Sequence, residues 1–98
     1  MTSTKKKLAN ELTKNNNVQF TPNGWNDYNY WSDNSKKLKR IKELTDDAQI
    51  GPLHGRGKPE RLSGDLKGYY SRRIDSEHRL IYKVIDGGLV IIQARFHY

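Results

Sequence analysis

The carboxyl-terminal third of the chain restricts the possible folds most, because it has the pattern of three consecutive β-strands. Residues 69–74, 78–85 and 89–95 are strand-like, and turn sequences separate them. The second turn, Asp86-Gly87-Gly88, is a strong hairpin signal. The nearly continuous apolar run of residues 89–95 is typical of a central or well-covered strand. We therefore predict that this part of the chain forms an antiparallel sheet.

Residues 18–50 have the patterns of one short strand and two helices. Val18-Gln19-Phe20 alternates apolar and polar side chains, which favours a strand. Thr21-Pro22 predicts a helix start, with a hydroxyl cap and proline at the first position. Asp33-Asn34 ends this helix and can cap a second one, which Gly51-Pro52 ends. The expected apolar faces are Trp25, Tyr28 and Trp31 on the first helix, and Leu38, Ile41, Leu44 and Ala48 on the second.

The chain has 98 residues, enough for one domain with a modest core. Residues 1–17 are polar and are expected to form a flexible, loosely attached extension. Residues 18–98 are expected to form one α+β domain with the order β-α-α-β-β-β, in which two N-terminal helices pack on a small antiparallel sheet.

Several functional classes are disfavoured. The sequence has no long apolar run and no cysteine, so we expect neither a membrane span nor a disulfide framework. The three histidines are widely spaced, which argues against a metal site, and we expect no cofactor. No apolar segment follows the lysines near the amino terminus, so we expect no signal peptide and a cytoplasmic protein.

The net charge of +7 and the pI near 9.7 suggest a polyanionic partner, such as nucleic acid or an acidic protein. A solvated basic surface without a partner is the alternative. The same choice applies to the second predicted helix, where a basic run can be an ordinary solvated face or a contact with RNA and the ribosome. That run includes Lys36, Lys37, Lys39 and Arg40.

The predicted strand pairing gathers groups suited to phosphate chemistry at one end of the sheet. The hairpin places Arg79 opposite residues 94–97, and the earlier turn brings Arg72 and Arg73 beside the same strand. His97 and Tyr98 then lie near these arginines, although a one-residue slip would exchange the two faces.

Arginine matches phosphate geometry, and histidine transfers protons near neutral pH. Glu60, in the basic Gly/Pro-rich loop, could supply a base. RNA carries its own nucleophile, the ribose 2'-hydroxyl, so these groups would suffice for an RNase. The alternative is a structural Arg79–Glu60 ion pair, with His97-Tyr98 capping a strand.

The chain resembles the YoeB/Txe branch of the RelE toxin superfamily from Phe20 to Tyr98, about four-fifths of its length. The similarity lies in five segments that occur in order with family-like spacing. They are Trp25-Asn26-Asp27-Tyr28 with Tyr30-Trp31, Gly55-Arg56-Gly57-Lys58-Pro59-Glu60, Leu66-Lys67-Gly68-Tyr69-Tyr70-Ser71-Arg72-Arg73-Ile74, Glu77-His78-Arg79-Leu80-Ile81-Tyr82, and Arg95-Phe96-His97-Tyr98.

The resemblance implies a RelE-like fold and the toxin component of a type II toxin-antitoxin system. It implies a metal-independent endoribonuclease that cuts mRNA in the ribosomal A site by 2'-hydroxyl attack. By similarity, Glu60 is the general base, Arg79 stabilises the phosphate, His97 is the general acid and Tyr98 orients the RNA. The residues expected to help hold RNA are Lys58, Arg72, Arg73 and His78.

The resemblance also implies partners: a YefM-like antitoxin, the 70S ribosome with its mRNA, and a second copy in a homodimer. Two features depart from the family pattern. Residues 1–17 have no usual counterpart, and Ser63 stands where many relatives carry a basic residue.

Two other functions remain open from the sequence. A toxin of the same fold could act on a protein target such as gyrase, although the terminal His-Tyr pair argues against this. A non-catalytic ribosome-binding inhibitor would block translation and leave mRNA intact.

Overall fold

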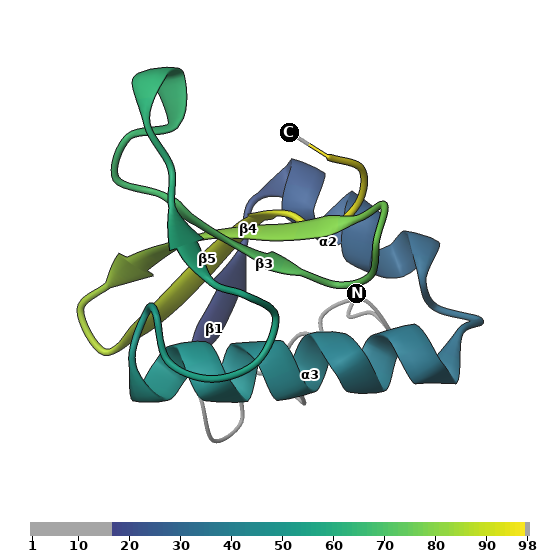
Figure 1. Ribbon diagram of the computed structural model, residues 1–98. Helices are drawn as coiled ribbons and strands as arrows, with labels where there is room; N and C mark the ends of the chain where they lie inside the picture. The colour runs from purple at the N-terminus through teal and green to yellow at the C-terminus, as the bar shows by residue number, and fades with distance from the viewer. Residues whose placement is uncertain (1–16, 98) are drawn as a thin grey trace.

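The computed structural model describes residues 17–97, so the predictions for residues 1–16 and for Tyr98 lie outside it. Two helices and a five-stranded sheet form the fold, which confirms the predicted α+β class (Figure 1). In the described range, no helix is long and apolar enough to cross a membrane. The elements in chain order are β1 (Val18–Phe20), α2 (Pro22–Tyr30), α3 (Ser35–Ile50), β2 (Glu60–Arg61), the 3-10 helix η1 (Gly64–Leu66), β3 (Tyr70–Arg73), β4 (Arg79–Ile85) and β5 (Gly88–Gln93).

The sheet has the strand order β1-β5-β4-β3-β2. Three of its pairings are antiparallel, but β1 runs parallel to β5. The sheet is therefore mixed rather than antiparallel throughout, which corrects the sequence prediction. The loop after α3 also contributes β2, a strand too short to show an alternating pattern, which pairs with the free edge of β3.

Both helices begin where the sequence predicts. The Thr21 side chain accepts a hydrogen bond from the backbone N–H of Gly24, and Pro22 occupies the first helical turn. The Asn34 side chain accepts from the backbone N–H of Lys37 and so caps α3. Each cap satisfies a backbone donor that a helix start leaves without an internal partner.

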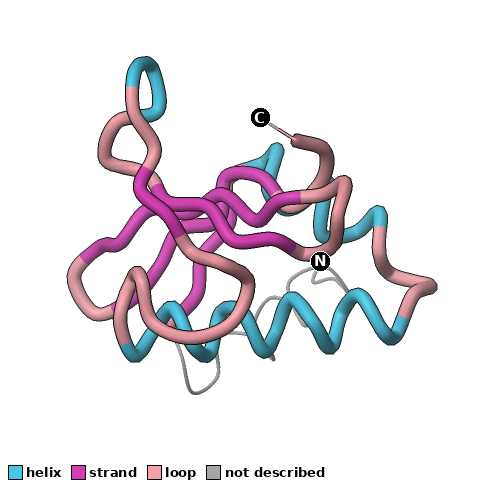
Figure 2. The backbone as a smooth tube through the Cα atoms, viewed as in Figure 1, coloured by secondary structure: helices cyan, strands magenta, loops and turns pink. Residues whose placement is uncertain are grey.

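The hydrophobic core lies between α3 and one face of the sheet (Figures 1 and 2). The predicted stripe of α3 faces this core, with Leu38 partly buried at its edge. The loop that contains η1 and the carboxyl-terminal segment both project on the side of the sheet away from α3 (Figure 1). The core residues are Val18, Trp31, Ile41, Leu44, Ala48, Ile74, Leu80, Tyr82, Leu89, Ile91 and Ala94.

Helix α2, which follows β1 in the chain, also packs against β5. The Asp27 carboxylate accepts from the backbone N–H of Ala94 at 3.0 Å, and the Trp31 indole N–H donates to the Ala94 carbonyl at 2.7 Å. Gly24 lets α2 approach closely, since a Cβ there would lie 2.2 Å from the Ile91 carbonyl oxygen. Ala94, the residue just after β5, is thus fixed by one side chain of α2 and by the Trp31 side chain that follows it.

The β4–β5 hairpin turns at Asp86-Gly87, because Ile85 pairs with Gly88. The predicted turn at Asp86-Gly87-Gly88 is confirmed, with Asp86 and Gly87 as its two central residues. A register shift between Ile81 and Tyr82 then adds one residue to β5, since Tyr82 pairs with Ile91 but Ile81 pairs with Gln93. Such a bulge changes which face later side chains occupy. The nearly continuous apolar run of β5 has no alternation, so no break in a pattern marks the bulge in the sequence.

Candidate active site

The register places Glu60 on the sheet face opposite the core. Glu60 pairs with Ser71, and Ser71 pairs with Ile81, so the three residues form a row across β2, β3 and β4. The alternate residues, Arg72 and Leu80, point toward α3, so this row points away from it. The Glu60 backbone lies about 10 Å from that of β4, at roughly 5 Å per strand spacing.

Arg73 and Arg79 occupy the same face. They are direct partners in the β3–β4 pairing. The backbone N–H of Arg79 donates to the Phe96 carbonyl at 2.9 Å, so the segment that carries His97 runs beside Arg79. The predicted placement of Arg79 opposite residues 94–97, with Arg73 beside it, is confirmed.

The Arg79 guanidinium is held by the turn that precedes β4. Its Nη1 donates to the carbonyls of Asp75, Ser76 and His78 at 2.9, 3.4 and 3.2 Å. The residue is only 7% exposed. These bonds fix the cation in place before any ligand binds, which is what electrostatic stabilisation of a developing charge requires.

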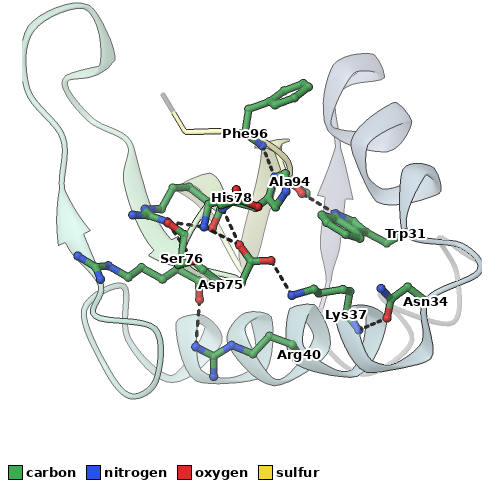
Figure 3. A network of polar contacts seen from close by, with 12 residues as sticks. Trp31, Asn34, Lys37, Arg40, Asp75, Ser76, His78, Ala94 and Phe96 are labelled. Carbon is green, nitrogen blue, oxygen red and sulfur yellow. Dashed lines mark hydrogen bonds and ion pairs between the residues drawn. The ribbon is translucent and has the colours of Figure 1, made fainter.

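Asp75 organises this turn and ties it to α3 (Figure 3). Its carboxylate accepts from the backbone N–H groups of Glu77 and His78 at 2.8 and 2.7 Å, and pairs with the Lys37 ammonium at 2.6 Å. Partial burial raises the pKa of Asp75, but the hydrogen bonds from Lys37 and from the two backbone N–H groups outweigh it and lower that pKa overall. The sequence indicated a turn here but gave no sign of this role.

His78 holds the carboxyl-terminal segment. Its Nδ1 accepts from the backbone N–H of Phe96 at 2.7 Å, and its ring meets that of Trp31 edge-on with centroids 4.9 Å apart (Figure 3). Phe96 has φ of 65°, a left-handed conformation that is uncommon for a bulky residue. The backbone directly before His97 is therefore constrained.

Arg72 is buried, which corrects its predicted role as an RNA contact. The side chain is 0% exposed, and it donates from Nε to the Tyr82 hydroxyl at 2.8 Å. The guanidinium also donates to the carbonyls of Arg56, Gly51 and Pro52. Burial raises the pKa of Tyr82, against the opposing effect of Arg72. The Arg72 side chain has no surface with which to bind RNA, because alternation along β3 turns it toward the core.

The loop that leads to Glu60 is anchored to α3 on one side and to β3 on the other. The Asp47 carboxylate accepts from the backbone N–H and side-chain Nε of Arg56 at 2.8 and 2.9 Å, and the side-chain hydrogen bond is the main reason that the pKa of Asp47 falls to about 2. The Gly57 carbonyl accepts from the Arg73 N–H at 2.7 Å. Lys58 then has φ of 48° and is exposed, as is Glu60.

The basic residues of α3 divide into two groups. Lys37 pairs with Asp75, and Arg40 donates to the Arg73 carbonyl at 3.0 Å, so both brace the sheet. Lys36 and Lys39 are exposed. Because α3 covers the core face, this helix lies on the opposite side of the sheet from Glu60 and Arg73. Within residues 17–97, no group of three or more His, Asp and Glu side chains could hold a metal ion.

A family model for the YoeB-like toxin of bacterial type II toxin-antitoxin systems matches residues 20–98. The chain belongs to this toxin family. It is 54% identical over 82 residues to the YoeB toxin of Streptomyces coelicolor, covering 83% of this chain and 98% of that protein. It is 45% identical over 80 residues to the YoeB toxin of Escherichia coli, covering 81% and 95%.

Solved structures agree with this assignment to the YoeB-like family. A YoeB-YefM complex from Staphylococcus aureus includes a chain that is 45% identical, with a TM-score of 0.78 and coverage of 85% of this chain and 98% of that one. YafQ from Escherichia coli, at 20% identity and a TM-score of 0.67, shares the fold. As a YoeB-like toxin, the protein has the predicted RelE-like architecture.

Proposed function

We propose that this toxin is a ribosome-dependent endoribonuclease that cleaves mRNA in the ribosomal A site. The observation that carries the proposal is the strand register. It sets Glu60, Arg73 and Arg79 on one face of the sheet, with the segment that carries His97 hydrogen-bonded beside Arg79. A base, a fixed cation and a titrating imidazole are the groups that RNA cleavage without a metal requires.

The proposed reaction uses the substrate's own nucleophile. Glu60 takes the proton of the ribose 2'-hydroxyl, and the 2'-oxygen then forms a bond to the adjacent phosphorus. The bond from phosphorus to the 5'-oxygen breaks, and His97 gives that oxygen a proton. The products are a 2',3'-cyclic phosphate and a 5'-hydroxyl. Arg79 stabilises the charge that develops on the phosphate, and Tyr98 orients the RNA.

Other residues of this face are proposed to hold the RNA. Arg73 and Lys58 are exposed cations beside Glu60 and Arg79, suited to contacts with flanking phosphates. Lys36 and Lys39, on the far side of the sheet, are suited to ribosomal RNA. These contacts would be screened by salt, as expected for binding to polyanions.

The proposed partners follow from relatives and charge. YoeB of Staphylococcus aureus has been solved in complex with YefM and as a dimer. We propose a YefM-like antitoxin whose acidic, partly disordered segment folds over the Glu60–His97 face, and a homodimer as a further state. A net charge of +7 favours such a segment. The toxin would act in the cytoplasm, where ribosomes translate.

The test is incubation of a defined mRNA with the purified toxin, in the presence and absence of translating ribosomes. We expect discrete cuts only when ribosomes are present. Inhibition of translation without cuts would favour the non-catalytic ribosome-binding alternative. Loss of supercoiling by purified gyrase, with mRNA intact, would favour the alternative that acts on a protein target.

A further inference from the structure

We propose that His78 is a positioning residue that holds the carboxyl-terminal segment so that His97 meets the scissile phosphate in a fixed geometry. This inference rests on the proposed nuclease function and deepens it. It replaces the expectation that His78 holds RNA.

The hydrogen bond between His78 and Phe96 has a defined direction. Nδ1 of His78 accepts from the Phe96 N–H at 2.7 Å. An imidazole nitrogen accepts only when it carries no proton, so the ring in this arrangement is neutral and its proton is on Nε2. The nitrogen nearest the active-site segment is therefore occupied by a structural bond.

His78 is itself held in place by its backbone and by its ring. Its backbone N–H donates to the Asp75 carboxylate at 2.7 Å, and its carbonyl accepts from the Ile74 N–H at 2.9 Å. Its ring packs edge-on against Trp31 and lies 6.1 Å from the Phe96 ring, centroid to centroid. A side chain fixed on several sides can impose its geometry on the backbone segment that it holds.

Phe96 has a backbone conformation that its hydrogen bonds maintain. A left-handed φ of 65° in a non-glycine residue costs on the order of 1–3 kcal/mol and persists only where the surroundings impose it. Both backbone polar atoms of Phe96 are held, the N–H by His78 and the carbonyl by the Arg79 N–H at 2.9 Å. The Gln93 amide also donates to the Arg95 carbonyl at 2.8 Å. Since His97 is the next residue, these bonds set the direction in which its side chain leaves the backbone.

His78 also connects the two proposed catalytic groups. The turn carbonyls that hold the Arg79 guanidinium include that of His78 itself, at 3.2 Å. One residue thus contacts the proposed phosphate-stabilising cation through its backbone and the segment with the proposed general acid through its side chain (Figure 3). When a cation and an acid act on the same phosphate, the distance between them must vary by well under 1 Å.

The experiment compares His78→Ala and His78→Asn with the wild-type toxin. His54→Ala is the matched control, because His54 is exposed and lies in the loop between α3 and β2. The asparagine Oδ1 can accept the Phe96 N–H bond near the place of Nδ1, whereas alanine cannot. Two readouts are needed: kcat and KM for mRNA cleavage on programmed ribosomes, and hydrogen exchange of individual backbone amides by NMR.

We expect His78→Ala to lower kcat by about 10- to 100-fold with KM within about 2-fold of wild type, because the proposed acid is misplaced while RNA contacts persist. The Phe96 amide should lose its protection while the Leu80 amide keeps it. His78→Asn should recover kcat to within about 5-fold of wild type, together with Phe96 protection. His54→Ala should match the wild type in both readouts.

Three results would overturn the proposal: a wild-type kcat in His78→Ala, a rise in KM alone, which would indicate RNA contact, or rapid exchange of the Phe96 amide in the wild-type protein. If His78→Ala does not fold, shown by loss of Leu80 protection, the wild type and His78→Asn still decide the question. If the wild type cuts no mRNA, the nuclease proposal fails. The exchange data still test whether His78 holds the backbone of Phe96.

Discussion

Arg73 and Arg79 are direct partners across β3 and β4, and both lie on the sheet face opposite the core. Like charges in this arrangement destabilise a strand pair. The backbone carbonyls of Asp75, Ser76 and His78 accept from the Arg79 guanidinium and partly offset its charge. An arrangement that repels itself in the free protein is suited to an anionic ligand, such as a phosphate of RNA.

The first prediction concerns Arg73, whose side chain is exposed. Arg73→Ala should change the free energy of unfolding by less than about 0.5 kcal/mol, because it removes a repulsion and little packing. It should weaken mRNA cleavage by raising KM, which denaturant unfolding and steady-state kinetics would measure together. A variant with wild-type KM would show that Arg73 does not contact the RNA.

Arg72, the adjacent residue, should behave in the opposite way. Arg72→Ala removes the donor to the buried Tyr82 hydroxyl and to the partly buried carbonyls of Arg56 and Gly51, so we expect a loss of about 2–4 kcal/mol in the free energy of unfolding. Arg72→Lys should recover little of it, since one ammonium cannot span acceptors that a guanidinium reaches in several directions. Urea unfolding of both variants, with Arg73→Ala as the matched control, tests this. Wild-type stability in Arg72→Ala would contradict the structural role.

Asp47 should make the free energy of unfolding depend on pH in the acid range. Its pKa of about 2 in the folded protein lies below the ordinary value of 3.8, so its contribution is complete above pH 3.8 and is lost as the pH falls toward 2. Wild-type unfolding should therefore become easier over that window. Asp47→Asn should be less stable near neutral pH and should show a shallower decline, with a remaining slope from Asp75, whose pKa is also lowered. If the free energies of unfolding of the two proteins had the same pH dependence, the lowered pKa of Asp47 would be refuted.

Gly24 should not tolerate a side chain. Alanine usually strengthens a helix by up to about 1 kcal/mol relative to glycine. Here its Cβ would lie 2.2 Å from the Ile91 carbonyl oxygen, so α2 would have to move away from β5. We expect Gly24→Ala to lower the thermal midpoint despite the better propensity, by an amount equivalent to about 1–3 kcal/mol. An unchanged or higher midpoint would show that α2 is not held against β5 as described.

Much of the fold could be predicted from local sequence signals. Thr21-Pro22 and Asn34 start the helices, the stripe of α3 faces the core, and Asp86-Gly87 turns the hairpin. Two features could not be predicted: the parallel pairing of β1 with β5, and the short strand β2. Both depend on how the helices position distant segments of the chain next to each other. These are long-range consequences of packing with no local pattern.

The candidate site could be predicted only in part. Hairpin counting brought Arg79 beside the carboxyl-terminal segment, and the family resemblance supplied the roles of Glu60 and His97. The burial of Arg72 was missed, because adjacent arginines on a strand look equivalent until the face of each is known. Asp75 and the bond from Phe96 to His78 were missed because no sequence pattern reports a side chain that accepts from a distant backbone N–H.

The most direct test of the proposed function is translation of a defined mRNA by purified ribosomes, with both ends of every fragment analysed, for wild type and His97→Ala. We predict discrete ribosome-dependent cuts that carry 2',3'-cyclic phosphate and 5'-hydroxyl ends, and a loss of at least about 100-fold in cutting rate in the variant. Arrested translation with the mRNA intact, or equal cutting by His97→Ala, would contradict it.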